Sequence, residues 1–353
     1  MKALVLSGGH GTRLRPITYS QQKQLIPIAN KPILFYAIED VIECGIRDIS
    51  IIVGPNKEQV IETVNGANFD AEITFIEQDA PRGLAHAVLI SEDFLGKEPF
   101  VMYLGDNILK EGITKHAENF KKKNFDASIM LTEVHNPEEF GVAELSKNGR
   151  VKRLIEKPKK PPSNLALVGI YFFNHPIHEA VKKIKPSWRN ELEITDALQW
   201  LIDNGYKVDA SIVSGWWKDT GKPEDILDAN RLILDDLTTK IKVEAGVEGE
   251  IRGRVAIDTG TKVNEGSVIK GPALIGRDCV IKDSYIGPYT SIGNNCKIIN
   301  SEVEDSVVMD GAMILNAGNI VDSMIGRGAI IDKNKNLPKG NKFVIGDNSW
   351  VRI

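Results

Sequence analysis

The stretch Ala3-Leu4-Val5-Leu6-Ser7-Gly8-Gly9-His10-Gly11-Thr12-Arg13-Leu14-Arg15-Pro16 decides the fold of the first part of this chain. Its first four residues form a short apolar run, which is typical of a buried strand in a parallel sheet. The glycines that follow let the backbone curl and bring a series of N–H groups close to a ligand, and such groups suit phosphate oxygens. The stretch therefore predicts a strand that ends in a phosphate-binding loop.

Two common kinds of glycine-rich loop do not match this stretch. A dinucleotide-binding fingerprint would need Gly or Ala in place of Leu14 and an acidic residue at the end of the next strand, where the chain has Ile52-Val53-Gly54. A P-loop would need the pattern GxxxxGK[ST], which does not occur around the loop. A plain turn that carries surface arginines stays open as a structural alternative.

Length and composition narrow the class of protein. A chain of 353 residues is longer than one ordinary core supports, so we expect two domains. The net charge of -4 gives no general attraction to polyanions, and we expect neither nucleic acid nor a membrane as a partner. The 3 cysteines show no CxxC pair and no metal-ligand spacing, which argues against a disulfide framework. Because the sequence shows no signal peptide and no apolar run that could span a bilayer, we expect a cytoplasmic protein.

The sequence up to about residue 236 alternates short β-branched runs with longer amphipathic stretches. This alternation predicts an α/β domain whose sheet is mostly parallel and covered by helices. The predicted strands are 3–6, 49–53, 72–76 and 99–104, and the predicted helices are 32–44, 83–95 and 114–123.

Beyond residue 240 the apolar period changes to six residues, with occasional steps of five. Such a hexad places one apolar side chain per strand inside a three-sided parallel β-coil of about 18 residues per turn. An irregular β-sandwich of short strands is the alternative. We expect domains at 1–240 and 241–335 and a tail at 336–353. The predicted inward residues are Ile251, Ile257, Val263, Ile269, Ile275, Ile281, Ile286, Ile292, Ile298, Val303, Met309, Leu315, Ile320, Ile325 and Ile331.

The loop and several later segments resemble the signature of the nucleoside-diphosphate-sugar pyrophosphorylases. Within that family the chain is most similar to the glucose-1-phosphate thymidylyltransferases, in the long form with a hexapeptide-repeat tail. The resemblance implies a Rossmann-like nucleotidyltransferase domain with a mixed, mostly parallel sheet, followed by a left-handed parallel β-helix. It rests on the loop and on Lys23-Gln24-Leu25-x-Pro27, Lys31-Pro32, Glu77 to Ala87, Leu104 to Asn107, Phe140-Gly141-Val142, Glu156-Lys157-Pro158, Gly169-Ile170-Tyr171, Glu191 to Asp196 and Trp217 to Gly221.

The implied reaction is attack of a sugar 1-phosphate oxygen on the α-phosphorus of a nucleoside triphosphate, with pyrophosphate leaving. The protein must hold two anions together and neutralise charge as the phosphorus becomes five-coordinate. Arg13 can bind phosphate oxygens through two N–H groups and Lys23 adds an ammonium, so we expect both to be catalytic. A solvated surface charge is the alternative for each of them.

Asp106 follows an apolar strand and a glycine, which places it at a strand's carboxyl end, where open α/β sheets hold their sites. Mg²⁺ prefers one or two carboxylates together with phosphate oxygens and water. The resemblance implies Asp219 as the second carboxylate, so we expect Mg²⁺ at Asp106 and Asp219. The alternatives are a turn-forming Asp-Asn pair and a loop acid.

The remaining expected site residues bind the two substrates. The Gln78 amide suits the O4 and N3–H edge of thymine or uracil, and together with the surrounding family motif this makes dTTP or UTP the expected nucleotide. A solvated glutamine at a strand end is the alternative. The predicted nucleotide-binding residues are Leu6, Ser7, Gly8, Gly9, Gly11, Thr12, Arg13, Gln78 and Gly83. For glucose 1-phosphate or a related sugar 1-phosphate, the resemblance implies Gly141, Glu156, Lys157, Leu167 and Tyr171. An exposed charged loop is the alternative for Glu156 and Lys157, and a core position is the alternative for Leu167 and Tyr171. His10 has no assigned role, and a packing role is expected for His86.

Three other functions stay open. One is a UDP-sugar pyrophosphorylase, and another is a bifunctional uridylyltransferase and acetyltransferase. Acetyl transfer on a β-helix usually relies on a histidine base, and all 6 histidines precede residue 240. The third is a non-catalytic regulatory subunit, which the presence of Arg13, Lys23, Asp106 and Asp219 argues against. We expect the β-helix to serve assembly into a homo-oligomer or contact with the first domain.

Overall fold

The computed structural model of the protein describes residues 1–9, 11–242, 246–333 and 348–351. The chain forms two compact units: the first comprises residues 1–10, 22–25 and 33–219, and the second comprises residues 11–21, 26–32 and 220–353. These units join segments that are distant in sequence, and the domain limits expected at 240 and 335 stay predictions. His10 and most of the expected tail 336–353 lie outside the described residues.

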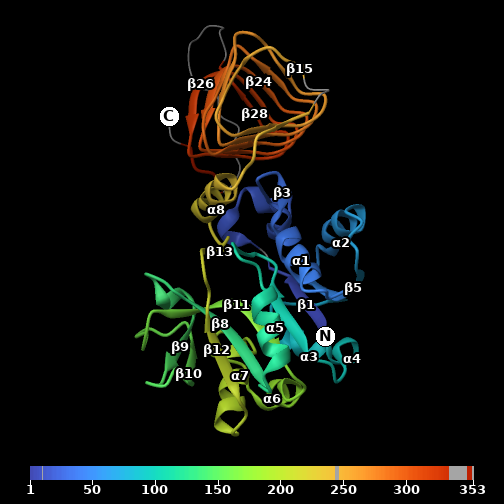
Figure 1. The fold of residues 1–353 in the computed structure, drawn as a ribbon, viewed down its shortest axis with the longest axis vertical. Coiled ribbons are helices and arrows are strands. Elements are labelled where there is room, and N and C mark those ends of the chain that lie inside the picture. Colours follow the sequence, from blue (N-terminus) through green and yellow to red (C-terminus); the bar gives the residue numbers. More distant parts are fainter. Residues whose placement is uncertain (10, 243–245, 334–347, 352–353) are drawn as a thin grey trace. The chain divides into compact units, whose positions relative to one another are not determined.

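A mixed sheet forms the centre of the first unit (Figure 1). Its parallel part has the order β6-β1-β4-β5, β11 runs antiparallel to β6, β8 and β9, and β12 is parallel to β8. The strands are β1 (Lys2–Ser7), β4 (Asp48–Val53), β5 (Glu72–Glu77), β6 (Phe100–Leu104), β8 (Ala127–Glu133), β9 (Gly141–Leu145), β10 (Val151–Glu156), β11 (Leu165–Phe173) and β12 (Val208–Ile212), with the separate pair β7 (Asn107–Leu109) and β13 (Trp217–Asp219). The predicted α/β class is confirmed.

Helices cover both faces of this sheet, because neighbouring strand residues alternate between two apolar clusters. Leu4 and Leu6 belong to one cluster with α3, α6 and α7, whereas Ala3 and Val5 belong to the other with α1, α2 and α5. The helices are α1 (Ile33–Glu43), α2 (Lys57–Gly66), α3 (Leu84–Ile90), α4 (Glu92–Leu95), α5 (Thr114–Lys122), α6 (Ile177–Lys183) and α7 (Ile194–Asp203). Among the described residues, none of the helices could cross a membrane.

The helix predicted over 83–95 is interrupted at Ser91, and this is the main local difference from the sequence prediction. The Ser91 hydroxyl donates to the carbonyl of Ala87 at 2.8 Å, and α3 ends at Ile90 before α4 begins at Glu92. A serine hydroxyl that bonds the carbonyl four residues earlier competes with the helix's own hydrogen bonds.

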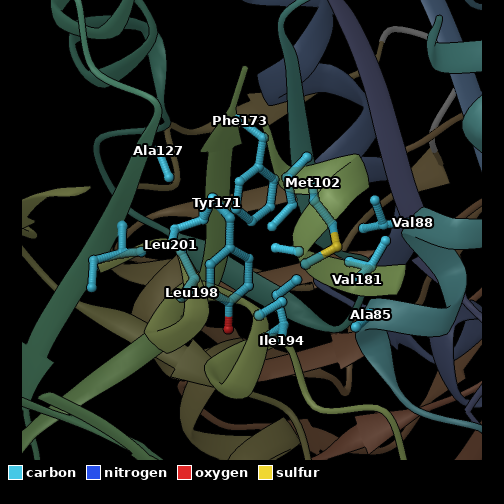
Figure 2. Packing of buried hydrophobic residues seen from close by; sticks show 14 of the residues in the cluster. Ala85, Val88, Met102, Ala127, Tyr171, Phe173, Val181, Ile194, Leu198 and Leu201 are labelled. Carbon is cyan, nitrogen blue, oxygen red and sulfur yellow. The ribbon is translucent and has the colours of Figure 1, made fainter. Parts of the chain in front are cut away.

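Figure 2 shows how the first cluster packs. Tyr171 and Phe173 of β11 have ring centroids 6.0 Å apart in a stacked pair, with Met102 of β6 beside them. Each buried side chain of this size contributes about 1.5–3 kcal/mol by leaving water. The helices around the pair supply Ala85, Val88, Val181, Ile194, Leu198 and Leu201.

The larger part of the second unit is a coil of short parallel strands, drawn orange to red in Figure 1. Ile257 pairs with Ile275, Ile275 with Ile292 and Ile292 with Val308, so each turn takes 16 to 18 residues. The predicted parallel β-helix is confirmed. Its strands are β14 (Lys240–Ile241), β15 (Gly246–Val247), β16 (Glu250–Arg252), β17 (Val255–Ile257), β18 (Lys262–Val263), β19 (Val268–Lys270), β20 (Ala273–Ile275), β21 (Val280–Lys282), β22 (Tyr285–Ile286), β23 (Thr290–Ile292), β24 (Lys297–Glu304), β25 (Val307–Val308), β26 (Met313–Val321), β27 (Met324–Ile325) and β28 (Ile330–Asp332).

Of the fifteen predicted inward residues, twelve belong to the apolar column of the β-helix or pack against it, Ile331 pairs with Ile314 of that column, and two positions are wrong. The apolar column contains Val308 and Ile314, which pair with Ile292 and Ile298, where the sequence pattern predicted Met309 and Leu315. The turn around Asp305, which has a positive φ of 50°, makes the step from Val303 to Val308 five residues where the pattern predicted six, and the register therefore shifts by one. A shift of one residue in a strand exchanges the inward and outward faces.

The second unit also contains α8 (Pro223–Asp235) and the short pair β2 (Pro27–Ile28) and β3 (Lys31–Pro32). Asn230 of α8 is 1% exposed and connects these parts. Its Oδ1 accepts from the Ala29 N–H and the Ser291 hydroxyl, both at 2.9 Å, and its Nδ2 donates to the Tyr289 carbonyl at 3.0 Å. One buried amide thus joins the β2–β3 turn to the β-helix.

The next residue of α8 makes a second, ionic connection to the β-helix. The Arg231 guanidinium donates twice to Asp305, with both distances 2.6 Å, and once each to Asp228 and Asp322 at 2.7 Å. Hydrogen bonding to Asp305 raises the pKa of Arg231. Such a paired arginine and carboxylate have a fixed relative geometry, so α8 is held against successive turns of the coil.

Candidate active site

The parallel strands of the first unit end at one edge of the sheet, and the candidate site lies there. β1 leads into Ser7, Gly8 and Gly9, and a Cβ on Gly54 after β4 would lie only 3.2 Å from the Gly8 carbonyl oxygen. Leu6 is largely buried, and the buried Ser7 hydroxyl has no hydrogen-bond partner within the described part of the chain. Gly54 therefore allows the close approach of the β1 and β4 ends.

A lysine and two aspartates meet at this edge, as the sequence predicted. The Lys23 Nζ lies 2.5 Å from Asp106 Oδ2 and 3.9 Å from Asp219 Oδ1. Lys23 is 8% exposed, while the aspartate side chains are 22% and 28% exposed. The carboxylates are close because β13 pairs with β7 so that Asp219 lies opposite Asn107, the residue after Asp106. Segments almost 200 residues apart thus build one charged cluster.

Asn107 fixes the orientation of Asp106. The indole N–H of Trp217 donates to Asn107 Oδ1 at 2.7 Å, and this makes the other end of the amide the donor that reaches Asp106 Oδ1 at 3.0 Å. Gly105 has no room for a side chain, because a Cβ there would lie 2.8 Å from both Leu34 Cδ1 and the Leu6 carbonyl oxygen. The two sequence neighbours of Asp106, Gly105 and Asn107, therefore restrict where its carboxylate can lie.

The two aspartates fit a magnesium ion. Mg²⁺ commonly takes one or two carboxylates and completes its shell with water and phosphate oxygens. A cation, the Lys23 ammonium, already lies against both carboxylates. No group of three or more His, Cys, Asp or Glu suited to a metal occurs in residues 1–9, 11–242, 246–333 or 348–351. The donor set therefore suits an ion that shares its ligands with a substrate, and not a closed structural site.

Gln78 and Gly83 are also brought together. Gln78 follows β5, and its Nε2 donates to the Gly83 carbonyl at 3.2 Å and lies 3.0 Å from His86 Nδ1. Gly83 has a φ of 97°, and a Cβ on it would overlap the backbone of Leu192. Only glycine fits this conformation and this contact. Burial, followed by the charge of Arg82, lowers the pKa of His86.

A second group of predicted residues surrounds Gly141 at the start of β9. A Cβ on Gly141 would lie 2.9 Å from Thr195 Cγ2, 3.0 Å from Glu156 Oε2 and 3.4 Å from Leu167 Cδ1. The Thr195 hydroxyl donates to Glu156 at 3.3 Å. The predicted sugar-binding residues Gly141, Glu156 and Leu167 therefore lie together.

The electrostatics of Glu156 are unusual for a half-buried acid. Burial raises its pKa, and the neighbouring Glu193 raises it further, while Lys157, Arg189 and Thr195 act in the opposite direction. Arg189 Nη1 lies 3.5 Å from Glu156 Oε1 and 3.4 Å from Glu193 Oε1. The arginine thus lies between two carboxylates that would otherwise repel each other.

The two remaining predicted sugar-binding residues differ in exposure: Lys157 lies at the surface and Tyr171 lies in the core. Lys157 is exposed, has a positive φ of 40° and donates its N–H to the Phe140 carbonyl at 3.0 Å, which turns the chain after β10. Tyr171 is 4% exposed and lies in the apolar cluster of Figure 2, where burial raises its pKa. Lys157 is open to a ligand, whereas the Tyr171 ring serves the core.

Gly11, Thr12 and Arg13 belong to the second unit. Gly11 has a φ of 60°, and its carbonyl accepts from the Thr18 hydroxyl at 2.7 Å. Arg13 lies against Gly221: a Cβ on that glycine would be 2.9 Å from one guanidinium nitrogen and 3.2 Å from Cζ. A side chain at residue 221 would therefore displace the end of the Arg13 side chain.

Several residues of the site were not predicted from the sequence. Asn107 and Gly221 are part of segments that carried the family resemblance, but nothing in their type indicated a role. Arg189 has no local sequence signal, because its contacts with Glu156 depend on how the chain returns to the sheet. His86 was expected only to pack. Its contact with Gln78 depends on the left-handed turn at Gly83.

Comparisons with known proteins show to which family the chain belongs. The family model described as nucleotidyl transferase matches residues 2–236. A glucose-1-phosphate thymidylyltransferase of Streptomyces antibioticus is 49% identical, with 100% of this chain and 99% of the relative covered. The low-salt glycan biosynthesis nucleotidyltransferase Agl11 of Haloferax volcanii is 46% identical, with 100% of both chains covered.

A solved structure shows the same likeness. It is a putative glucose-1-phosphate thymidylyltransferase from Bacillus anthracis in complex with a sucrose, with a TM-score of 0.62 and 37% identity, and the match covers 68% of this chain and 98% of that one. The chain belongs to the nucleotidyl transferase family.

Proposed function

We propose that the protein transfers a thymidylyl group from dTTP to glucose 1-phosphate, forming dTDP-glucose and pyrophosphate. The observation that carries this proposal is the cluster of Lys23, Asp106 and Asp219 at the carboxyl edge of the sheet. An ammonium and a two-carboxylate cation site suit a reaction in which two phosphate groups must be held together. The relatives described above support the choice of substrates.

In this reaction an oxygen of the sugar phosphate forms a bond to the α-phosphorus, and the bond from that phosphorus to the β-phosphate oxygen breaks. Asp106 and Asp219 would hold Mg²⁺, which when bound neutralises phosphate charge. Lys23 contributes a buried ammonium to the same anions. Arg13 is assigned to the triphosphate from the sequence resemblance alone. No covalent enzyme intermediate is needed, because positioning and charge neutralisation supply the catalysis.

The other residues bind and orient the substrates. Gln78 reads the pyrimidine edge, and Gly83 lets the backbone come close to the base. Glu156 accepts hydrogen bonds from sugar hydroxyls, and Gly141 leaves room for the ring. Lys157, exposed beside Glu156, binds the sugar phosphate.

Pyrophosphate release tests the proposal. The purified chain with Mg²⁺ is incubated with dTTP, UTP, dCTP or ATP in combination with a panel of sugar 1-phosphates. We expect the highest kcat/KM for dTTP with glucose 1-phosphate and no release without Mg²⁺. Absence of turnover with every pair would overturn the enzyme assignment.

UTP is the second candidate nucleotide, because the Gln78 amide can pair with uracil as well as with thymine. A single methyl group changes specificity by only about 10–200-fold. If kcat/KM for UTP exceeds that for dTTP in the same panel, the protein is a uridylyltransferase.

We also propose that the β-helix mediates self-association. Its long parallel faces offer a regular surface, and exposed aliphatic residues such as Val321 and Ile330 lie on its last turns. Sedimentation of the full chain should give a mass that is a multiple of 39.0 kDa. A monomer at micromolar concentration would contradict this assignment.

A further inference from the structure

The side-chain amide of Gln78 uses both of its N–H groups. Its nitrogen lies 3.2 Å from the Gly83 carbonyl oxygen and 3.0 Å from His86 Nδ1. A carbonyl can only accept, so the amide end that faces Gly83 is the nitrogen. The second contact then requires His86 Nδ1 to be an acceptor, which means that the imidazole is neutral and carries its proton on Nε2.

The oxygen of the same amide has no hydrogen-bond partner among the described residues. It faces the glycine loop, 3.7 Å from the position that a Cβ would take on Gly8. Because both N–H groups of Gln78 are engaged, the amide offers only an acceptor toward that loop.

We propose that His86 is a positioning residue for base selection: by accepting from Gln78 Nε2, it keeps Gln78 Oε1 turned toward the nucleotide. The inference rests on the proposed function, in which Gln78 reads the base. Thymine and uracil carry a donor at N3, which an amide oxygen can accept. Cytosine carries an acceptor at N3, which would face that oxygen without a proton between them. His86 thereby favours dTTP or UTP over dCTP.

The surroundings of His86 support the neutral imidazole that this geometry needs. Burial lowers the pKa of His86, and the positive charge of Arg82 lowers it further, while Asp79 opposes them. Arg82 and Asp79 are themselves joined at 2.6 Å, which limits the influence of Asp79 on the imidazole. Near neutral pH the imidazole of His86 is thus favoured in its neutral form, which leaves Nδ1 free to accept.

The test is the ratio of kcat/KM for dTTP to kcat/KM for dCTP, measured with the two nucleotides in competition. In His86→Leu the Gln78 amide loses one of its two anchors and can rotate. We expect the ratio to fall about tenfold or more, through a higher KM for dTTP, while the KM for glucose 1-phosphate stays unchanged. His86→Asn can place an oxygen where Nδ1 lies and should restore most of the ratio.

His116→Leu is the matched control. His116 is also half-buried, its Nδ1 lies 2.9 Å from the Ser211 hydroxyl, and burial lowers its pKa. We expect a change in Tm similar to that of His86→Leu and no change in the nucleotide ratio. If His86→Leu does not fold, His86→Met provides the same loss of an acceptor.

Two results would overturn the inference: an unchanged ratio in folded His86→Leu or His86→Met, or an equal fall in His116→Leu. A wild-type enzyme that transfers thymidylyl groups but uses dCTP equally well would also overturn it, and the nucleotidyltransferase assignment would stand. Absence of turnover with both dTTP and UTP would instead overturn the proposed function.

Discussion

The molecule contains two polar clusters that are built differently. In the first, Lys23 lies against Asp106 and Asp219, and the carboxylates are partly exposed at the edge of the sheet. In the second, Asn230 is 1% exposed and makes three hydrogen bonds to Ala29, Tyr289 and Ser291. The first holds charges that a ligand can reach, whereas the second places neutral partners around one buried amide.

This difference indicates which cluster serves chemistry and which serves folding. A buried polar side chain whose partners are all protein groups stabilises one arrangement of the chain, and its loss leaves several groups unpaired. The partly exposed carboxylates of Asp106 and Asp219 contribute less to stability, because water solvates them in the folded chain as well as in the unfolded chain. We therefore expect substitutions in the two clusters to separate activity from stability.

The largest expected effect is that of Asp219→Asn in the first cluster. The substitution keeps the shape of the side chain and removes one negative charge beside the Lys23 ammonium. We expect kcat to fall by about a hundredfold or more, because a charge that binds the cation or orients the lysine is lost. Tm should change by no more than about 2 °C. Steady-state kinetics and thermal unfolding of the same preparation check both parts.

The next effect is that of Asn230→Leu in the second cluster. The Ala29 N–H, the Tyr289 carbonyl and the Ser291 hydroxyl would lose their partner inside the protein. Each unpaired buried group costs about 1–3 kcal/mol, so the free energy of unfolding should fall by several kcal/mol. Denaturant titration measures this loss. A variant as stable as the wild type would show that the cluster is not the structural one.

Glu156→Gln tests a residue that combines burial with a proposed role in binding. We expect the KM for glucose 1-phosphate to rise about tenfold, since hydrogen bonds to a charged acceptor are lost. Tm at neutral pH should stay equal or rise. Enzyme kinetics and calorimetry give the two values, and a large fall in Tm with an unchanged KM would assign Glu156 to the fold.

The pH dependence of stability follows from the raised pKa of Glu156. Because its folded pKa lies above the ordinary value of 4.5, the protonated form is favoured in the folded state. Its contribution to stability is present below the unfolded pKa and is lost as pH rises through the folded pKa. As pH rises from the unfolded pKa through the folded pKa, the wild type should therefore lose unfolding free energy relative to Glu156→Gln.

The smallest effect is that of Gly221→Ala. The new methyl group would lie 2.9 Å from an Arg13 guanidinium nitrogen, and the flexible end of the arginine can move away. We expect a fall in kcat/KM of about threefold to tenfold and little change in Tm. Gly66→Ala is the control for the loss of a glycine, because Gly66 has no positive φ and no atom lies within 4 Å of the added Cβ. Full activity in Gly221→Ala would mean that the position of Arg13 is not critical.

The sequence was informative where a local motif or a regular apolar period identifies the structure. Lys23 and Asp106 were predicted because a strand and a glycine precede the aspartate and because the loop requires cations, and the structure brings them together with Asp219. The parallel β-helix was predicted because its apolar period of six differs from that of any helix or ordinary sheet.

Other features could not be predicted, because they depend on long-range geometry. Asn230 lies in an ordinary amphipathic helix, and its three bonds reach residues that are about 60 and 200 positions away. The inward position of Val308 depends on a five-residue step after Val303, which the sequence pattern placed between Leu315 and Ile320. The tautomer of His86 follows only from the direction of the Gly83 carbonyl.

The central claim is that the Lys23 cluster serves chemistry and the Asn230 cluster serves folding. Its most direct test compares kcat for dTTP and glucose 1-phosphate in Asp219→Asn and Asn230→Leu at a temperature where both are folded. We expect kcat to fall about a hundredfold or more in Asp219→Asn and to stay within about twofold of the wild type in Asn230→Leu. A normal kcat in Asp219→Asn together with a large fall in Asn230→Leu would contradict it.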